Sequence, residues 1–275
     1  MSIDLHTHTT CSDGTLSPEA LVQYAREKNL EAIAVTDHDS VAGNERAIQE
    51  GVSTGIEVVP GVELSAECEK GSLHILGLFV DSRSYSITEA TVFLQKKRRE
   101  RNISIIGALE VMGMSIEKEL FLHNAYLGRP HIAQALVRAG YCSTIDEAFE
   151  EYLKRGASAY VEREKLSERA TIRSLIGAGG IPVLAHPVTV FDVEKTVERL
   201  CKEGLKGIEV YYPSHTEENV DHFKFLAKQH GLFITGGSDF HGSHKPHIDL
   251  GCMKVPYILL KRMKEYRALS NSQST

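Results

Sequence analysis

The chain has 275 residues, of which 42% are hydrophobic and 25% charged. This composition excludes the disordered and fibrous classes and allows one large domain with an insertion. The formal net charge of −6 excludes global attraction to nucleic acid or to an anionic membrane, so we expect no membrane partner and no stable nucleic-acid complex, and an anionic substrate would require local positive charge.

The apolar residues and the cysteines indicate in which cellular compartment the protein is expected. No apolar run is long enough to span a membrane, and the N-terminus enters the first motif without a signal peptide. The five cysteines are odd in number and lack a C-x-x-C spacing, so they do not suggest a disulfide framework. We expect a cytoplasmic protein, and the sequence gives no indication of its oligomeric state.

The first eighty residues alternate between strand and helix patterns. His6 and His8 lie two apart on a short apolar segment, where strand geometry places both on one face. Ser17 and Pro18 predict a helix start, as N-cap and first helical residue. The apolar run 32–36 predicts a strand buried on both faces, which is typical of a parallel sheet. A helix near 41–51 and strands at 56–64 and 72–79 follow.

The alternation stops near residue 84, and residues 84–166 read as an inserted helical subdomain. Strands return at 181–185, 207–212 and 232–237, with helices at about 192–202 and 217–230 between them. Strand and helix repeated about seven times favours a closed or nearly closed parallel β/α barrel, formed by residues 1–83 and 167–275.

Histidines and carboxylates recur at the ends of these strands. In a parallel barrel such positions converge on one face, and the candidates are His6, His8, Asp13, His38, Glu63, His74, His186, Asp239 and His241. Imidazole combined with carboxylate suits zinc, manganese or iron. Because nine ligands are too many for one ion, the pattern predicts two or three divalent metal ions.

In this order the residues resemble the motifs of the PHP (polymerase and histidinol phosphatase) family of metal-dependent phosphoesterases. The matching motifs are His6-Thr7-His8, Asp37-His38, Glu63, His74, His186 and Asp239-Phe240-His241. The resemblance implies a distorted seven-stranded, TIM-like β/α barrel. It also implies that His6, His8 and Asp239 hold one ion, that Glu63 bridges it to a second held by His74 and His186, and that Asp13, His38 and His241 form a third site.

Within that family the chain is most similar to a stand-alone branch that acts on 3′,5′-nucleotide bisphosphates and on the 5′ ends of short RNA. The branch's features here are Ser12-Asp13-Gly14, Glu63 to Ala66, His74 to Gly77, and Gly128 to His131 in the insertion. The resemblance implies hydrolysis of a phosphorylated small molecule or short 5′-phosphorylated RNA by metal-activated water. If the third site holds no ion, Asp13 or His38 could instead be catalytic, carrying protons.

Four further residues are candidates for binding substrate. Arg129 opens a helix beside a glycine, where its guanidinium and the helix N-terminus could hold a second phosphate. Arg98 and Arg101 lie three apart on one helical face, and His215 follows a strand end. A solvated surface position is the competing interpretation for each.

Two other functions fit the same ligands. A histidinol-phosphate phosphatase, or another small-molecule monophosphate phosphatase, would share every metal ligand, but an arginine-bearing insertion suits a substrate with a second phosphate better. A barrel that keeps metals only for stability or binding would be expected to have lost ligands, and the nine candidates are all present.

Overall fold

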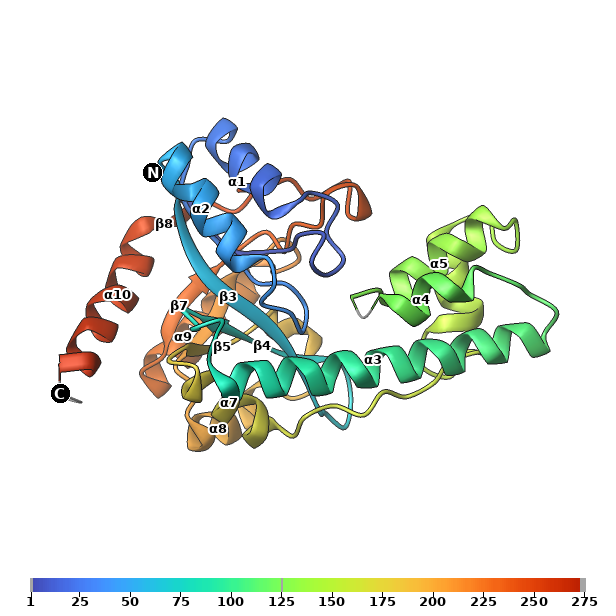
Figure 1. The fold of residues 1–275 in the computed structure, drawn as a ribbon. Coiled ribbons are helices and arrows are strands. Elements are labelled where there is room, and N and C mark those ends of the chain that lie inside the picture. Colours follow the sequence, from blue (N-terminus) through green and yellow to red (C-terminus); the bar gives the residue numbers. More distant parts are fainter. Residues whose placement is uncertain (1, 125, 273–275) are drawn as a thin grey trace. The chain divides into compact units, whose positions relative to one another are not determined.

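The computed structural model describes residues 2–124 and 126–272. The contacts divide the chain into two compact units, which Figure 1 shows as a ribbon. The first unit comprises Met1–Ala90 and Leu166–Thr275, and the second comprises Thr91–Lys165.

One eight-stranded sheet forms the centre of the first unit, in the order β7-β6-β5-β4-β3-β2-β1-β8. Its strands are β1 (Ser2–Thr7), β2 (Leu30–Val35), β3 (Glu57–Ala66), β4 (Leu73–Leu78), β5 (Ile181–Leu184), β6 (Gly207–Tyr211), β7 (Phe233–Gly236) and β8 (Val255–Pro256). The chain that leaves β7 runs along β1, because Asp239 N donates to His6 O at 2.8 Å and His8 N donates to Phe240 O at 3.0 Å. The sheet is therefore a nearly closed barrel, in which β1 lies beside the segment that follows β7.

The sheet is mixed, so the expected seven parallel strands are not confirmed. Strand β4 runs antiparallel to both β3 and β5, and β8 pairs antiparallel with β1 as an eighth strand. Only residues 67–72 connect β3 to β4. A parallel pair needs a crossover of a dozen or more residues, so this short connection allows only a hairpin.

Helices flank the sheet of the first unit: α1 (Pro18–Glu27), α2 (Asn44–Thr54), α7 (Glu168–Gly177), α8 (Val193–Glu203), α9 (Glu217–His230) and α10 (Tyr257–Ser272). The predicted start of α1 is confirmed, because Ser17 Oγ accepts from Ala20 N at 3.2 Å and Pro18 is its first residue. Helix α10 continues to Ser272, and its Leu260 and Met263 are fully buried in the barrel core.

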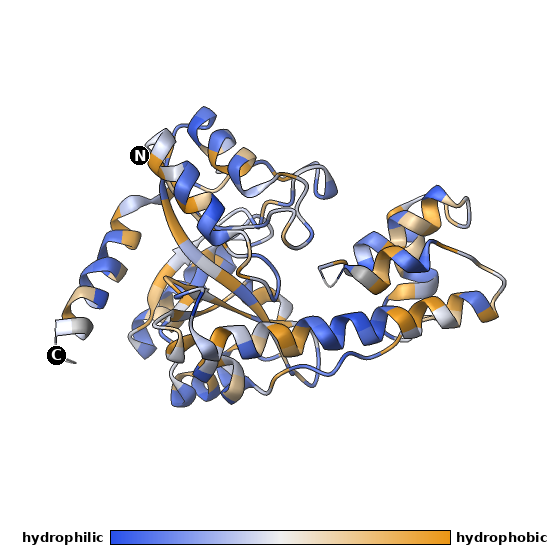
Figure 2. Ribbon diagram, in the orientation of Figure 1, coloured by the Kyte–Doolittle hydropathy of each residue, from blue (hydrophilic) through white to orange (hydrophobic). Residues whose placement is uncertain are grey.

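The second unit is helical and has a core of its own. Its helices are α4 (Lys118–His123), α5 (Arg129–Arg138), α6 (Ile145–Ala148) and a π-helix (Phe149–Leu153), together with most of α3 (Tyr85–Val111). Side chains such as Ile105, Phe121 and Ile132 form its apolar cluster. Figure 2 shows the middle of α3 as a hydrophilic band, over the basic run at 96–101, between more apolar segments. The helical prediction for the insertion is thus confirmed as far as Leu153.

Two further features concern membranes and thiols. Among the helices built from residues 2–124 and 126–272, none is long and apolar enough to cross a membrane. The five cysteines are free thiols.

Candidate metal centre

The nine predicted ligands gather at one end of the barrel. Six of them follow the carboxyl ends of β1, β2, β5 and β7, the position at which such barrels build their sites. His6 and Glu63 lie within β1 and β3, and His74 stands near the beginning of β4. Since β4 is antiparallel, its beginning lies beside the end of β3, where His74 pairs with Ser65. Strand direction therefore brings His74 to the same face as the others.

Ligand atoms meet there in three overlapping groups, within each of which the nitrogen and oxygen atoms lie within 4.8 Å of one another. The first group is His6, His8, Glu63 and Asp239, the second is His38, Glu63 and His74, and the third is His8, Asp13, His38 and His241. His186 joins the second through its Nε2, which is 2.8 Å from Glu63 Oε1. His8 and His38 belong to two groups each, so the groups share members more extensively than the family motifs imply.

Glu63 lies at the centre of the arrangement and is completely buried. Its Oε1 faces His74 Nδ1 at 2.9 Å and His186 Nε2 at 2.8 Å. Its Oε2 faces the Nε2 atoms of His6 and His8, each at 3.3 Å, and His38 Nδ1 at 2.9 Å. The two oxygens of one carboxylate thus serve different sets of histidines, which is the geometry of a bridging ligand.

Hydrogen bonds on the outer nitrogens fix how the first two histidines face inward. His6 Nδ1 lies 3.0 Å from Glu209 Oε1 and donates to this carboxylate. His8 Nδ1 lies 3.4 Å from Ser12 Oγ, whose own proton is donated to Asp37 Oδ1 at 2.6 Å. Each Nδ1 must therefore carry the proton, which leaves Nε2 with a lone pair toward the centre.

Two more histidines also have Nδ1 hydrogen-bonded on the outer side and Nε2 directed inward, whereas His74 has the opposite orientation. His186 Nδ1 lies 3.1 Å from Thr189 Oγ1, and His241 Nδ1 donates to Asp239 O at 2.7 Å. Both present Nε2 inward. His74 instead directs Nδ1 at Glu63 and has Nε2 3.3 Å from Ser72 Oγ. The centre is therefore organised by an outer layer of hydrogen bonds, as is usual for metal-ligating histidines.

Several of the inward atoms lack hydrogen-bond partners, and this observation tests whether a metal fits. Among the described residues, buried polar side-chain atoms with no hydrogen-bond partner include His6 Nε2, His8 Nε2, Asp13 Oδ1, His38 Nδ1 and Glu63 Oε2. Leaving such atoms unsatisfied in the interior costs free energy. Divalent cations would satisfy all of them at once, and nitrogen with carboxylate oxygen is the donor set that zinc, manganese and iron accept.

The carboxylates of the centre remain ionised although they are buried. Burial opposes the charge of Glu63, but His38, His74 and His6 together hold its pKa well below the usual value. Burial likewise opposes ionisation of Asp13 and Asp239, and the surrounding histidines keep both pKa values well below the usual range. The centre is therefore a buried negative cluster that attracts cations.

The histidines divide by environment in the metal-free state. Burial lowers the pKa of His74 to about 4, and burial together with His8 lowers that of His241. Burial also acts against protonation of His8, but the nearby carboxylates of Asp239 and Glu63 outweigh it and raise the pKa to about 9. The pKa of His6 is raised well above its usual value, chiefly by Glu209 and Glu63 against burial. Protons on His6 and His8 thus offset part of the negative charge when no metal is bound.

Three residues that the sequence analysis did not single out touch the ligands. Glu209, on β6, is completely buried against His6. Tyr212 Oη donates to Asp239 Oδ2 at 2.9 Å, and Lys245 Nζ lies 2.6 Å from the same oxygen. Asp239 therefore keeps Oδ1 for the centre, 3.0 Å from His8 Nε2. A charged residue within the apolar run of β6 was the signal available for Glu209, whereas loop residues such as Lys245 carry no such mark.

His215 lies beside these residues, in the first unit. Its Nδ1 donates to Val210 O at 2.8 Å, and its ring centroid is 5.1 Å from that of Tyr212. Tyr212 in turn lies 5.6 Å from the ring of His186. The Nε2 of His215 is buried and has no hydrogen-bond partner, and burial lowers its pKa. His215 thus has an acceptor nitrogen available.

The three predicted arginines come together within the second unit, and a fourth joins them. Arg98 and Arg101 are buried side chains of α3, at 7% and 8% exposure, and Arg129 opens α5. Burial lowers the pKa of Arg101 well below its usual value, and Arg163, Arg98 and Arg129 add to the effect by repulsion. Four guanidinium groups gathered in a partly buried place have the charge and the hydrogen-bond donors that could hold an anion.

Hydrogen bonds to neighbouring residues hold two of the arginine side chains in place. Arg101 Nε donates to Asn102 Oδ1 at 3.1 Å, and Arg129 Nη1 donates to Leu153 O at 3.0 Å. Gly128 permits the close approach of Arg98, because a Cβ there would lie 3.1 Å from Arg98 Nη1. The predicted helix start at Gly128 is confirmed. Arg163 was missed because it lies in a charge-rich segment that resembles an ordinary solvated surface.

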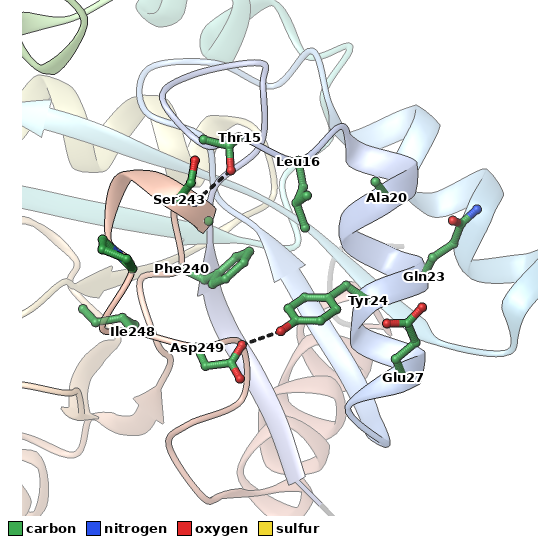
Figure 3. Close-up of a pocket in the computed structure, with 12 residues that line it drawn as sticks. Thr15, Leu16, Ala20, Gln23, Tyr24, Glu27, Phe240, Ser243, Ile248 and Asp249 are labelled. Carbon is green, nitrogen blue, oxygen red and sulfur yellow. Dashed lines mark hydrogen bonds between the residues drawn. The ribbon is translucent and has the colours of Figure 1, made fainter. Parts of the chain in front are cut away.

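A separate cavity of about 680 Å³ lies between α1 and the loop that follows β7 (Figure 3). Tyr24 Oη donates to Asp249 Oδ1 at 2.7 Å, and Ser243 N donates to Thr15 Oγ1 at 3.0 Å. Phe240 forms part of its wall and is 5% exposed, with its ring 5.8 Å from that of Tyr24. Since Phe240 stands between Asp239 and His241 in the chain, this packing anchors the segment that carries those two ligands.

Known proteins resemble the chain over nearly its whole length. The PHP domain matches residues 4–168. The chain is 31% identical to a 3′,5′-nucleoside bisphosphate phosphatase of Chromobacterium violaceum, with 91% of this chain and 90% of that protein covered. It is 33% identical to a 5′-3′ exoribonuclease of Haemophilus influenzae, covering 86% and 89%.

A solved structure agrees with these matches. A protein from Bifidobacterium adolescentis, described as a metal-dependent phosphoesterase, superimposes with a TM-score of 0.87 at 29% identity and covers 94% of both chains. The domain match spans more than half of the chain, and the curated relatives cover both of its units. The chain belongs to the PHP family and is a hydrolase of phosphoric ester bonds.

Proposed function

We propose that the chain hydrolyses phosphate esters of nucleotides with two or three divalent ions, manganese, zinc or iron, held at the barrel end. The observation that carries the proposal is Glu63, whose two oxygens face separate sets of histidines at 2.8 to 3.3 Å. His6, His8 and Asp239 would hold one ion, and His74 and His186 a second. Asp13, His38 and His241 would hold a third. When bound, such ions activate water and offset the negative charge that builds up at phosphorus.

The chain's own residues supply proton transfer in this proposal. His38 has a side chain that is 16% exposed, whereas Glu63 and His8 are completely buried. It lies 2.9 Å from Glu63 and 3.9 Å from Asp13. If the third site holds no ion, His38, with Asp13, would instead deliver a proton to the leaving oxygen, because His38 contacts both solvent and the carboxylates.

The substrate we propose is a 3′,5′-nucleotide bisphosphate or a short 5′-phosphorylated oligoribonucleotide. One of the relatives named above is a 3′,5′-nucleoside bisphosphate phosphatase, and the other is a 5′-3′ exoribonuclease. The arginine cluster supports the proposal, because Arg98, Arg101 and Arg129 would bind a second phosphate, and Arg163 would add to them. We further propose that residues 84–166 act as the substrate-capping subdomain, and that the free Nε2 of His215 accepts a hydrogen bond from substrate.

Phosphate release tests the proposal. The substrates are adenosine 3′,5′-bisphosphate, its two single-phosphate analogues, a short 5′-phosphorylated RNA and histidinol phosphate, each with manganese and with a chelator. We expect chelator-sensitive turnover, fastest for the bisphosphate or the RNA. A preference for histidinol phosphate would favour a monophosphate phosphatase instead, and no chelator-sensitive turnover of any of them would overturn the proposal.

A further inference from the structure

We infer that Glu209 is a positioning residue that determines which nitrogen His6 presents to the metal centre, an inference that rests on the metal-binding role proposed above. Glu209 is part of β6 and is completely buried. Its Oε1 lies 3.0 Å from His6 Nδ1, and its Oε2 accepts from His186 N at 2.7 Å. One carboxylate thus contacts residues from two of the three proposed ion sites.

The direction of the hydrogen bond between Glu209 and His186 cannot change. A backbone N–H can only donate, so one oxygen of Glu209 is always an acceptor toward His186. His186 has a φ of +28°, outside the regions that residues other than glycine usually occupy. Such a conformation persists where surrounding contacts hold it. The buried hydrogen bond from His186 N to Glu209 is one of these contacts.

The contact with His6 is the one that can change. A neutral imidazole carries its proton on either nitrogen, and the partner of one nitrogen decides which. A carboxylate accepts at both oxygens, so Glu209 requires a proton on His6 Nδ1 and leaves Nε2 free. That Nε2 lies 3.3 Å from Glu63 Oε2 and 3.5 Å from Asp239 Oδ1, among the other inward atoms.

Glutamine at this position would keep the shape and reverse the imidazole. Its carbonyl oxygen would accept from His186 N, which leaves its amide group, a donor, against His6 Nδ1. His6 would then accept at Nδ1 and carry its proton on Nε2, where no lone pair remains for an ion. The opposite amide orientation would place two donors against each other at His186, a buried contact that costs free energy.

Zinc affinity measured by competition with a chromogenic chelator tests the inference, with Glu209→Gln compared to wild type. We expect binding of the ion at His6 to weaken roughly 10- to 100-fold, the range for removal of an outer partner of a metal ligand. The matched control is Glu57→Gln, because Glu57 is a barrel carboxylate that accepts from Tyr257 Oη and Lys264 Nζ, at 2.6 and 2.7 Å. Its substitution should leave zinc affinity unchanged.

A nitrogen-15 spectrum of histidine-labelled, zinc-loaded protein provides the second readout, which a merely structural role would not move. We expect His6 in wild type to carry its proton on Nδ1 and in Glu209→Gln to carry it on Nε2. Unchanged affinity and an unchanged His6 signal in folded Glu209→Gln would overturn the inference. If that variant does not fold, a wild-type His6 protonated on Nε2 overturns it alone. Absence of zinc binding by wild type would overturn the proposed metal role as a whole, and this inference with it.

Discussion

The metal centre of the first unit and the arginine cluster of the second bury charge of opposite sign. At the metal centre, Glu63, Asp13 and Asp239 stay ionised, and inward atoms lack hydrogen-bond partners. In the arginine cluster, like charges crowd Arg101 and lower its pKa. Burying charged groups close to others of the same sign is costly. A ligand of the opposite sign would offset that cost, a cation in the first region and an anion in the second.

The two regions also differ in how firmly they are organised. At the metal centre, an outer layer that includes Glu209, Ser12 and Asp37 fixes the histidine rings. The arginine cluster has contacts to Asn102 and Leu153, but the guanidinium groups repel one another. Rigid placement suits a reacting group, whereas a site of mutually repelling cations suits binding. We therefore expect substitutions in the first region to affect catalysis and those in the second to affect substrate preference.

The largest expected effect comes from removing the shared carboxylate. Glu63→Gln should lower kcat by more than about 100-fold, beyond the range for residues that only support a ligand, because two sets of histidines face its oxygens. The barrel should stay folded, since glutamine has nearly the same volume. Steady-state kinetics with manganese, metal content after dialysis and circular dichroism measure these outcomes. Near wild-type activity with unchanged metal content would contradict the bridging role.

Arg101→Met tests the other side of the comparison. If Arg101 binds the second phosphate as proposed, loss of its guanidinium should lower kcat/KM for adenosine 3′,5′-bisphosphate roughly 10- to 100-fold. The same substitution should have little effect on a single-phosphate analogue. Relief of repulsion should also raise the melting temperature in phosphate-free buffer. Arg99→Met is the matched control, because Arg99 is an exposed neighbour on α3. An equal loss for both substrates would argue against a role in substrate preference.

The charge of the metal centre predicts how the metal-free protein responds to pH. The folded state raises the pKa of His8 from 6.5 to about 9, so this proton stabilises the fold fully below pH 6.5 and is lost as the pH rises through 9. The raised pKa of His6 acts in the same direction. With a chelator present, urea unfolding between pH 6.5 and 9 should show stability falling with pH. Manganese should reduce the fall, because it replaces the protons. Stability that rises over this range in chelator would contradict the assignment.

Much of this comparison could be read from the sequence, for reasons that differ by residue. The nine histidines and carboxylates were found because their order and strand-end context are local features, and the structure brings all nine together. The direction of β4 was missed although the short connection at 67–72 indicated a hairpin. Arg163 could not be singled out, because the other arginines of its cluster lie in distant segments of the chain. Lys245 could not be singled out, because its contact with Asp239 depends on the conformation of the loop after β7.

The smallest expected effect on stability comes from breaking an exposed ion pair, which serves as a reference for the two buried charged regions. Arg46 and Glu19 form a double contact at 2.6 and 2.7 Å, and their side chains are 51% and 35% exposed. The hydrogen bond from Arg46 lowers the pKa of Glu19 to about 2, so the pair stabilises the fold above pH 4.5 and the contribution disappears as the pH falls through 2. Arg46→Met should change the stability only slightly at pH 7, because solvent screens the pair. Urea denaturation at pH 7 and at pH 3 measures this. A large loss of stability in Arg46→Met would mean that exposed pairs in this chain contribute like buried ones. Burial would then not distinguish the two charged regions from the rest of the surface.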